Sequence, residues 1–216
     1  MIIKPQRFLS LHEAKLKPCR TQYTTYQTVE ELNKKLNNFD YGIVVGNKKY
    51  TGSDIDVTKY RTIPPEVFEK FKCGTCWDYT CYEAEYFEKN FTDIDYSLYY
   101  MQLNTTDDIE PTHTFLTYTY FNNDHDVWYL FESAWKRNKG VHGHSGDSWR
   151  NTIILKEYIE TFKEEVIEEQ KCEVTGYIMT KFEPPTKYGL TPSEFMKHCL
   201  GGEVVINKNF KYKELN

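Results

Sequence analysis

Two neighbouring runs of β-branched and aromatic residues constrain the fold of this chain more than any other feature. They are PTHTFLTYTYF (111–121) and VWYLFESAW (127–135), and only the polar stretch NNDHD separates them. Such residues favour extended strands, and a short polar connection between two of these runs is typical of a β-hairpin. We therefore expect antiparallel strands to form part of the core.

The segment 76–89 shows a clear helical pattern. Its apolar side chains recur at i, i+4, i+7 and i+10, which places them on one face of a helix: Trp77, Cys81, Ala84 and Phe87. The spacing predicts a central helix. Before this helix the sequence predicts a helix at 28–39 capped by Thr28 with Glu31, a strand at 41–50 bent at Gly46-Asn47, and a short helix EVFEKF after Pro64-Pro65. After the hairpin it predicts a segment at 151–169 that starts strand-like and continues as an amphipathic helix, a strand at 174–182, and a Thr-capped helix at 191–202.

The order of these elements indicates the α+β class rather than a parallel doubly wound sheet, because helices and antiparallel strands are segregated along the chain. The 216 residues are 39% hydrophobic and 16% aromatic, which is enough to fill one core. We expect a single domain, 1–216, with an N-terminal arm at 1–60, a core at 61–155 and a helix–strand–helix extension at 156–216.

The charge pattern argues against nucleic-acid and membrane partners. The net charge of −5 is spread along the chain, without a basic stripe, and no run approaches the roughly 20 apolar residues of a membrane span. The first residues do not resemble a secretory signal. We therefore expect a cytoplasmic protein, without a cofactor, whose cysteines are mostly reduced: Cys19, Cys73, Cys76, Cys81, Cys172 and Cys199.

Cys76 lies where the central helix is expected to begin. If Thr75 is the N-cap, with its hydroxyl accepting from the amide of Asp78, then Cys76 is the first helical residue. The unpaired amides and the positive end of the helix dipole favour a thiolate there, and the same amides can donate to an oxyanion. The alternative is that Cys76 is a buried, inert cysteine.

A catalytic thiolate needs a histidine and an acceptor that orients it, and the hairpin offers both. An even-numbered connection places Phe115 opposite Glu132, so that His113 becomes a diagonal neighbour of Glu132 on the same face. A connection of three or five residues would place them on opposite faces. The alternatives are an edge-strand histidine and a solvated glutamate.

These motifs carry a resemblance to a known family. GTCWDY, then THTFLTY, then a strand ending in FESAW resemble the transglutaminase-like branch of the papain-like cysteine enzymes, over about residues 64–136. The resemblance implies that Cys76 is the nucleophile, His113 the base and Glu132 the orienting acid. The family usually has Asp at the third position, so Glu132 is a departure.

The function expected from this set is cysteine-dependent acyl transfer on a peptide, protein or other amide-containing substrate. We expect hydrolysis of an amide, peptide or isopeptide bond, because the chain lacks the flanking domains of the large protein-crosslinking members of the family. Amine transfer of the transglutaminase type is an alternative. A second alternative is a binding module that keeps the fold without turnover.

Three competing patterns lie near these residues. Cys73-Gly-Thr-Cys76 is also a CxxC, which could belong to a redox motif or to a zinc site, although no second cysteine pair follows at similar spacing. His142 and His144 in VHGHSGD (141–147), or His125 between two aspartates, could touch a metal. We expect 141–147 to be a mobile surface loop, with a lid as the alternative, and Trp77 and Trp135 to be core or cleft wall.

Overall fold

The computed structural model has an α+β fold with two sheets and describes residues 22–92, 94–107, 110–122, 125–135, 140–145 and 148–210. The larger sheet has six strands in the order β7-β6-β5-β4-β8-β9, and every neighbouring pair is antiparallel. Its strands are β4 (Ile94–Thr105), β5 (Thr112–Asn122), β6 (His125–Glu132), β7 (Gly140–Ser145), β8 (Val174–Phe182) and β9 (Glu203–Asn209).

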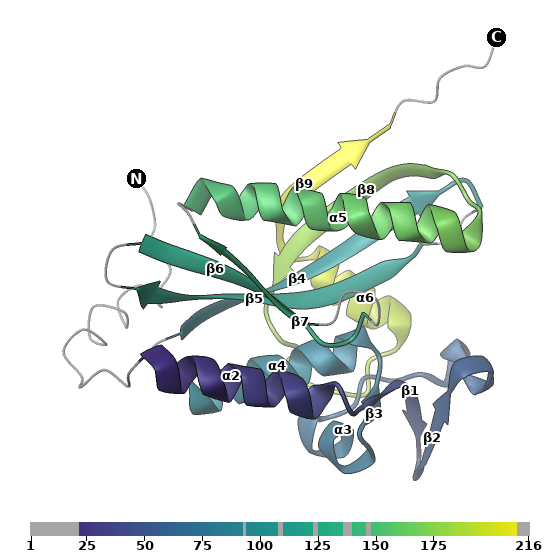
Figure 1. Ribbon diagram of the computed structural model, residues 1–216. Coiled ribbons are helices and arrows are strands. Elements are labelled where there is room, and N and C mark those ends of the chain that lie inside the picture. The colour runs from purple at the N-terminus through teal and green to yellow at the C-terminus, as the bar shows by residue number, and fades with distance from the viewer. Residues whose placement is uncertain are drawn as a thin grey trace.

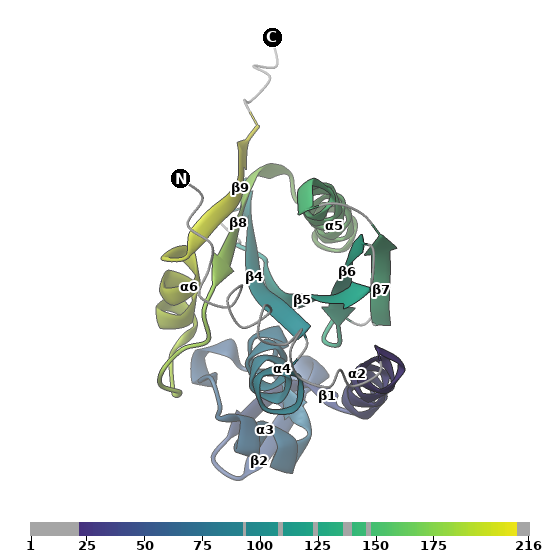
Figure 2. The same ribbon diagram turned by 90° about the vertical axis from the view of Figure 1, so that its left-hand side faces the viewer.

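Helices cover both faces of this sheet (Figure 2). On one face lie α2 (Gln22–Leu36), α4 (Cys76–Asn90) and α6 (Pro192–Leu200), with the short α3 (Pro65–Phe71) packed against α4, and on the other lies α5 (Ser148–Gln170). The buried apolar side chains accordingly form two clusters, one on each side. In β5, Leu116 and Tyr118 belong to the α4 cluster, whereas Phe115 belongs to the α5 cluster, as the alternation along a strand requires.

The smaller sheet brings an earlier part of the chain to the start of α4. It consists of β1 (Asp40–Val45), β2 (Lys48–Thr51) and β3 (Cys73–Gly74) in the order β2-β1-β3. The bend predicted at Gly46-Asn47 is the turn of a hairpin, and Gly46 has a φ of 61°, which glycine adopts without strain. Because β1 pairs with β3 in parallel, Tyr41 lies opposite Gly74, two residues before Cys76.

Most of the predicted elements are present. The hairpin strands, the helix at 76–89, the strand at 174–182 and the helix at 191–202 are confirmed as β5, β6, α4, β8 and α6. Thr191 is the N-cap of α6, with Pro192 following it and Glu194 completing the reciprocal cap.

Three predictions about elements were wrong. The first helix begins at Gln22 at the latest, so Thr28 lies inside α2 instead of capping it. The segment expected to start as a strand at 151 is helical throughout α5, because tertiary packing overrides the weak strand propensity of its β-branched residues. Residues 141–145 form strand β7 rather than a loop, while 146–147 lie outside the described residues.

The predictions missed the central strand β4. Its burial is continuous from Ser97 to Leu103, since helices cover both of its faces, and a strand buried on both sides lacks the alternation that identifies strands in a sequence. The run YSLYYM (96–101) belongs to this strand. It is the middle of the sheet, between β5 and β8.

Phe87 joins α4 to the sheet, so its loss tests the packing of these two layers. Its ring is 1% exposed and lies within 5.4 to 5.9 Å of the rings of Tyr96, Tyr118 and Phe131, centroid to centroid. We expect Phe87→Ala to lower the free energy of unfolding by about 3–5 kcal/mol, because the truncation leaves a cavity. Urea unfolding measures this. A loss no larger than that of Glu85→Ala, on the same helix, would contradict the packing described.

Candidate active site

The N-terminus of α4 presents Cys76 as its first residue, after the N-cap Thr75, as predicted. Asp78 fixes this end of the helix to the preceding chain. Its buried carboxylate accepts hydrogen bonds from the amide of Thr75 at 2.9 Å, and from the hydroxyl of Tyr60 and the amide of Ile63 at 3.0 Å each. Burial raises the pKa of Asp78 to about 6, against the opposing effect of these donors. The position of the thiol is thus set by a buried polar network.

His113 and Glu132 form a buried ion pair on the hairpin. The register places Phe121 opposite Asp126 and Leu116 opposite Phe131, which is the even-numbered connection assumed from the sequence. The Nε2 atom of His113 lies 2.7 Å from Oε2 of Glu132, and both side chains are buried. The structure therefore brings this predicted pair into direct contact.

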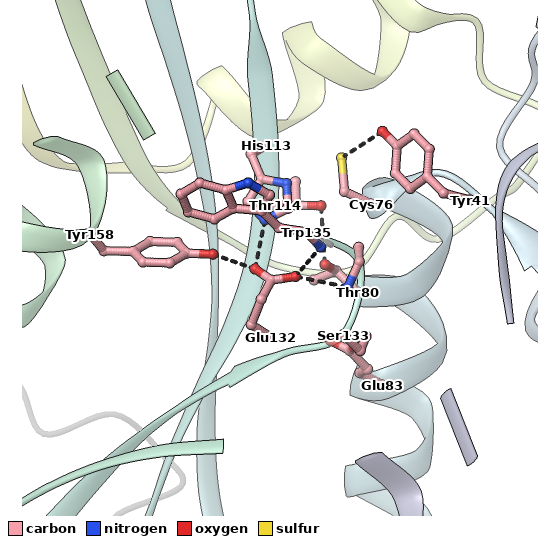
Figure 3. Close-up of polar contacts among 11 residues, drawn as sticks. Tyr41, Cys76, Thr80, Glu83, His113, Thr114, Glu132, Ser133, Trp135 and Tyr158 are labelled. Carbon is pink, nitrogen blue, oxygen red and sulfur yellow. Dashed lines mark hydrogen bonds and ion pairs between the residues drawn. The ribbon is translucent and has the colours of Figure 1, made fainter. Parts of the chain in front are cut away.

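Cys76 lies near the imidazole of His113 (Figure 3). The interaction with the Cys76 thiol is one of the causes that raise the pKa of His113. Because Nε2 is bound to Glu132, Nδ1 is the ring nitrogen left for the sulfur. The structure therefore gathers the three residues predicted from the sequence in one place, with His113 in direct contact with Glu132 and Cys76 near the imidazole.

The electrostatics of the pair favour an imidazolium. Burial acts against the charged ring, but the Glu132 carboxylate and the contact with Cys76 outweigh it and raise the pKa of His113 to about 10. Burial likewise disfavours the Glu132 carboxylate, yet the charge of His113 and several hydrogen-bond donors lower the pKa of Glu132 below its ordinary value. At neutral pH the site thus holds a charged, desolvated pair.

The Glu132 carboxylate is fixed from several directions. Its Oε1 atom accepts from the amides of Ala134 at 2.8 Å and Trp135 at 2.6 Å, and its Oε2 atom accepts from the hydroxyl of Tyr158 on α5. Trp135 also packs edge-on against the ring of His113, with centroids 5.9 Å apart, which agrees with the predicted role of Trp135 as a wall. A glutamate can serve here because its longer side chain folds back onto the bend that follows the strand.

Tyr41 is a site residue that the sequence analysis did not identify. Its ring is about half exposed (51%), while its hydroxyl points inward and donates to the Cys76 sulfur at 3.9 Å. The charge of a Cys76 thiolate, together with burial of the hydroxyl, raises the pKa of Tyr41 well above its ordinary value. Cys76 itself is only 3% exposed, and the half-exposed Tyr41 contacts its sulfur.

Sequence reasoning also missed Tyr158, Glu83 and Ser133. Tyr158 lies in the predicted amphipathic helix at 151–169, and nothing in its spacing indicates a carboxylate partner. Glu83 is a buried carboxyl on α4 that accepts a hydrogen bond from the Ser133 hydroxyl. The signal that could have exposed Glu83 is its position seven residues after Cys76, on the same face of the helix as the thiol.

Three other described cysteines have thiols whose pKa is raised by burial. Burial raises the pKa of Cys73 to about 11 and raises those of Cys81 and Cys199 further. Within the described ranges Cys73 and Cys76 are separate thiols, and no three His, Cys, Asp or Glu side chains there could share a metal ion. The described part of the chain therefore contains no set of side chains that could form the zinc site considered above.

Some candidate residues cannot be placed in a site. The side chains of His125, His142 and His144 lie outside those that the structure describes, although their backbones belong to β6 and β7. Asp124 and Asp147 lie outside the described residues altogether. Trp77 belongs to the α4 core, stacked on Phe195 with ring centroids 4.7 Å apart, as expected.

Comparisons with known proteins leave the family open. No family model matches the chain, no curated protein matches its sequence, and no solved structure matches its fold. The described helices include none that is both long enough and apolar enough to cross a bilayer. The geometry of the site is therefore the basis for any statement about function.

Glu132→Gln tests the electrostatic description of the pair. Without the carboxylate charge, burial is expected to dominate, so the pKa of His113 should fall from about 10 to its ordinary value near 6.5 or below. An NMR titration of the His113 ring signals in wild type and variant measures both values. A His113 that titrates near 10 in both proteins would contradict the assignment of the shift to Glu132.

The same shift predicts a pH dependence of stability. Because the pKa of folded His113 lies above its value in the unfolded chain, its contribution to stability is fully present below about pH 6.5 and is lost as pH rises through about 10. Urea unfolding of wild type over this range should show that loss. In Glu132→Gln the loss over this window should be smaller or absent, and an equal slope in both proteins would contradict the linkage.

Tyr41→Ala tests the access to the sulfur. Removing the ring should open a path to Cys76, and we expect alkylation of Cys76 by a bulky maleimide to become about tenfold faster or more, while a small haloacetamide gains less. Quantitative mass spectrometry of the modified peptide measures both rates. Lys49→Ala, on the neighbouring strand, serves as the control. Equal effects on the two reagents would contradict the placement of Tyr41 over the thiol.

Proposed function

We propose that this protein is a cysteine-dependent acyl-transfer enzyme in which Cys76, His113 and Glu132 act as a catalytic triad. The observation that carries the proposal is the convergence of a thiol at a helix N-terminus with an imidazole that is bound directly to a buried carboxylate. Each group has the position that its role needs: nucleophile, proton carrier and orienting acceptor.

The proposed reaction begins with the proton of Cys76 on the imidazole of His113. The thiolate attacks an amide carbonyl carbon, so that a C–S bond forms and the carbonyl oxygen becomes an oxyanion. The imidazolium then gives its proton to the leaving nitrogen as the C–N bond breaks, which leaves a thioester on Cys76. A water molecule attacks the thioester while His113 accepts its proton, and the acid product leaves with the thiol restored.

Glu132 contributes by holding the imidazole in one orientation. Its Oε2 atom accepts from Nε2, which directs Nδ1 toward the sulfur, and its negative charge stabilises the imidazolium that the reaction requires. The two backbone amides and the Tyr158 hydroxyl on the carboxylate keep it from rotating away. The pair would thus be preorganised before a substrate binds.

Two donors are available for the oxyanion. The amide of Cys76 lies in the first turn of α4, where an amide has no acceptor within the helix. The Tyr41 hydroxyl already points at the sulfur, so it is the candidate for the second donor once a substrate carbonyl takes its place there. A substrate must displace this hydroxyl in order to reach Cys76.

The class of enzyme that this arrangement supports best is a thiol hydrolase of the papain-like kind. Within it, the helix carrying Cys76, packed on an antiparallel sheet that supplies His113 and the acid, supports the transglutaminase-like branch. Substrates of this class are peptides, proteins or other amides, and the site as proposed needs no cofactor. Transfer to an amine in place of water uses the same thioester and differs only in the acceptor.

A noncatalytic binding module is the second candidate, and one observation favours it. Cys76 is only 3% exposed, and its sulfur already accepts a hydrogen bond from Tyr41, so the thiol has little contact with solvent. In such a module the Cys76–His113–Glu132 array would be retained as buried structure, and the thiol would show no enhanced reactivity. Reactivity therefore separates the two candidates.

Labelling with an amide-mimicking electrophile is the experiment that tests the proposal. We expect one adduct per chain, located on Cys76 by mass spectrometry, since the Cys73, Cys81 and Cys199 thiols are buried with raised pKa values. His113→Ala should lose most of the labelling, and Cys76→Ala all of it. Adducts on other cysteines, or labelling that is unaffected in His113→Ala, would favour the binding module.

A further inference from the structure

The face of α4 that carries Cys76 continues with two buried polar residues. Thr80 and Glu83 follow Cys76 at i+4 and i+7, so the three side chains lie along one side of the helix (Figure 3). The Thr80 hydroxyl donates to the Thr114 hydroxyl at 3.0 Å, and Glu83 accepts from the hydroxyl of Ser133. Successive turns of α4 therefore make polar contacts with the hairpin.

These contacts end beside the proposed base and acid. Thr114 follows His113 in β5, and Ser133 follows Glu132 at the end of β6. The helix that presents the thiol is thus tied directly to the residues next to the other two members of the triad. Only a helix held in this register keeps the sulfur within reach of the imidazole.

The contact of Glu83 with Ser133 has a specific consequence for Glu132. The carboxylate of Glu132 is oriented by the amides of Ala134 and Trp135, which belong to the bend that begins at Ser133. The direction in which the carboxylate points therefore depends on where this bend lies. Glu83 holds the first residue of the bend against α4.

Packing alone does not explain a glutamate at position 83, because burying a carboxyl is energetically unfavourable. It is 2% exposed, and burial raises its pKa to about 8, so it is largely neutral at pH 7. Glu132, His113 and Cys76 are the titratable groups near it from the site, and Tyr79 and Cys81 are those on its own helix. An apolar side chain would fill the same space without the energetic penalty of burying a carboxyl. What an apolar side chain could not provide is the hydrogen bond with Ser133.

We propose that Glu83 is a positioning residue of the active site, which acts through Ser133 to hold the Glu132 bend in register with the helix that carries Cys76. This inference rests on the proposed function, because it concerns how the same triad is assembled. It assigns a role to a carboxyl that neither touches a substrate nor takes part in proton transfer.

The pH profile of Cys76 alkylation by iodoacetamide tests this inference in the full-length protein. Glu83→Leu and Ser133→Ala should each slow the reaction at neutral pH by about tenfold and move the midpoint of the profile up by about one pH unit, since a displaced Glu132 supports the imidazolium less well. Glu83→Gln, which is neutral and can still accept from Ser133, should restore most of the rate. The double variant Glu83→Leu, Ser133→Ala should be no slower than either single variant.

Two references separate the possible failures. Glu85→Leu, on the same helix, controls for a general loss of stability. Thermal unfolding shows which variants are folded. If Glu83→Leu does not fold, Ser133→Ala provides the test. If Glu83 had only a structural role, its replacement would lower the unfolding temperature, but the midpoint of the alkylation pH profile would not move in the folded protein. A midpoint that does not move in Ser133→Ala overturns the inference. If His113→Ala also leaves the profile unchanged, the proposed function fails as well; if His113→Ala moves it, only the role of Glu83 fails.

Discussion

The buried ion pair between His113 and Glu132 is the interaction on which the rest of the site depends. Two charges taken out of water are costly, and their attraction offsets that cost only when the geometry is good and the remaining hydrogen-bonding capacity is used. Here the hairpin register brings Nε2 of His113 within 2.7 Å of Oε2 of Glu132. Two backbone amides and the Tyr158 hydroxyl donate further hydrogen bonds to the Glu132 carboxylate. The result is an imidazole that favours its charged form and directs its free nitrogen at Cys76.

The site is assembled from both layers of the fold. Cys76 comes from α4, which packs on one face of the sheet, whereas the ring of His113 lies among aromatic side chains of the α5 layer, with Trp135, Tyr158 and Phe162 within 5.8 to 6.4 Å between centroids. Cys76 and His113 approach each other near the start of β5 and the N-terminus of α4. In the proposed mechanism, small shifts of the helix along the sheet would separate the thiol from the imidazole, so the polar contacts of Thr80 and Glu83 would serve the chemistry as well as the packing.

Local signals in the sequence were sufficient to predict the parts of the site that lie on regular elements. The N-cap at Thr75 and the helical period placed Cys76, and the period of two along the hairpin placed His113 and Glu132 on one face. Tyr41, Tyr158 and Ser133 were not predictable in this way, because their contacts join elements that are distant in the chain. Glu83 shares the helix face of Cys76, but its partner Ser133 could not be inferred from that spacing. The strand β4 was missed for a related reason, since burial on both faces removes the pattern that marks a half-exposed strand.

The central proposal is that Cys76 gives its proton to His113, whose imidazolium Glu132 supports, and the ultraviolet absorbance of the thiolate tests it most directly. The account predicts that wild type at about pH 6 shows one thiolate band per chain, which is absent from Cys76→Ser, lost in His113→Ala and weakened in Glu132→Gln. No thiolate band in the folded wild type at this pH, or a band that persists when His113 is removed, would contradict the account.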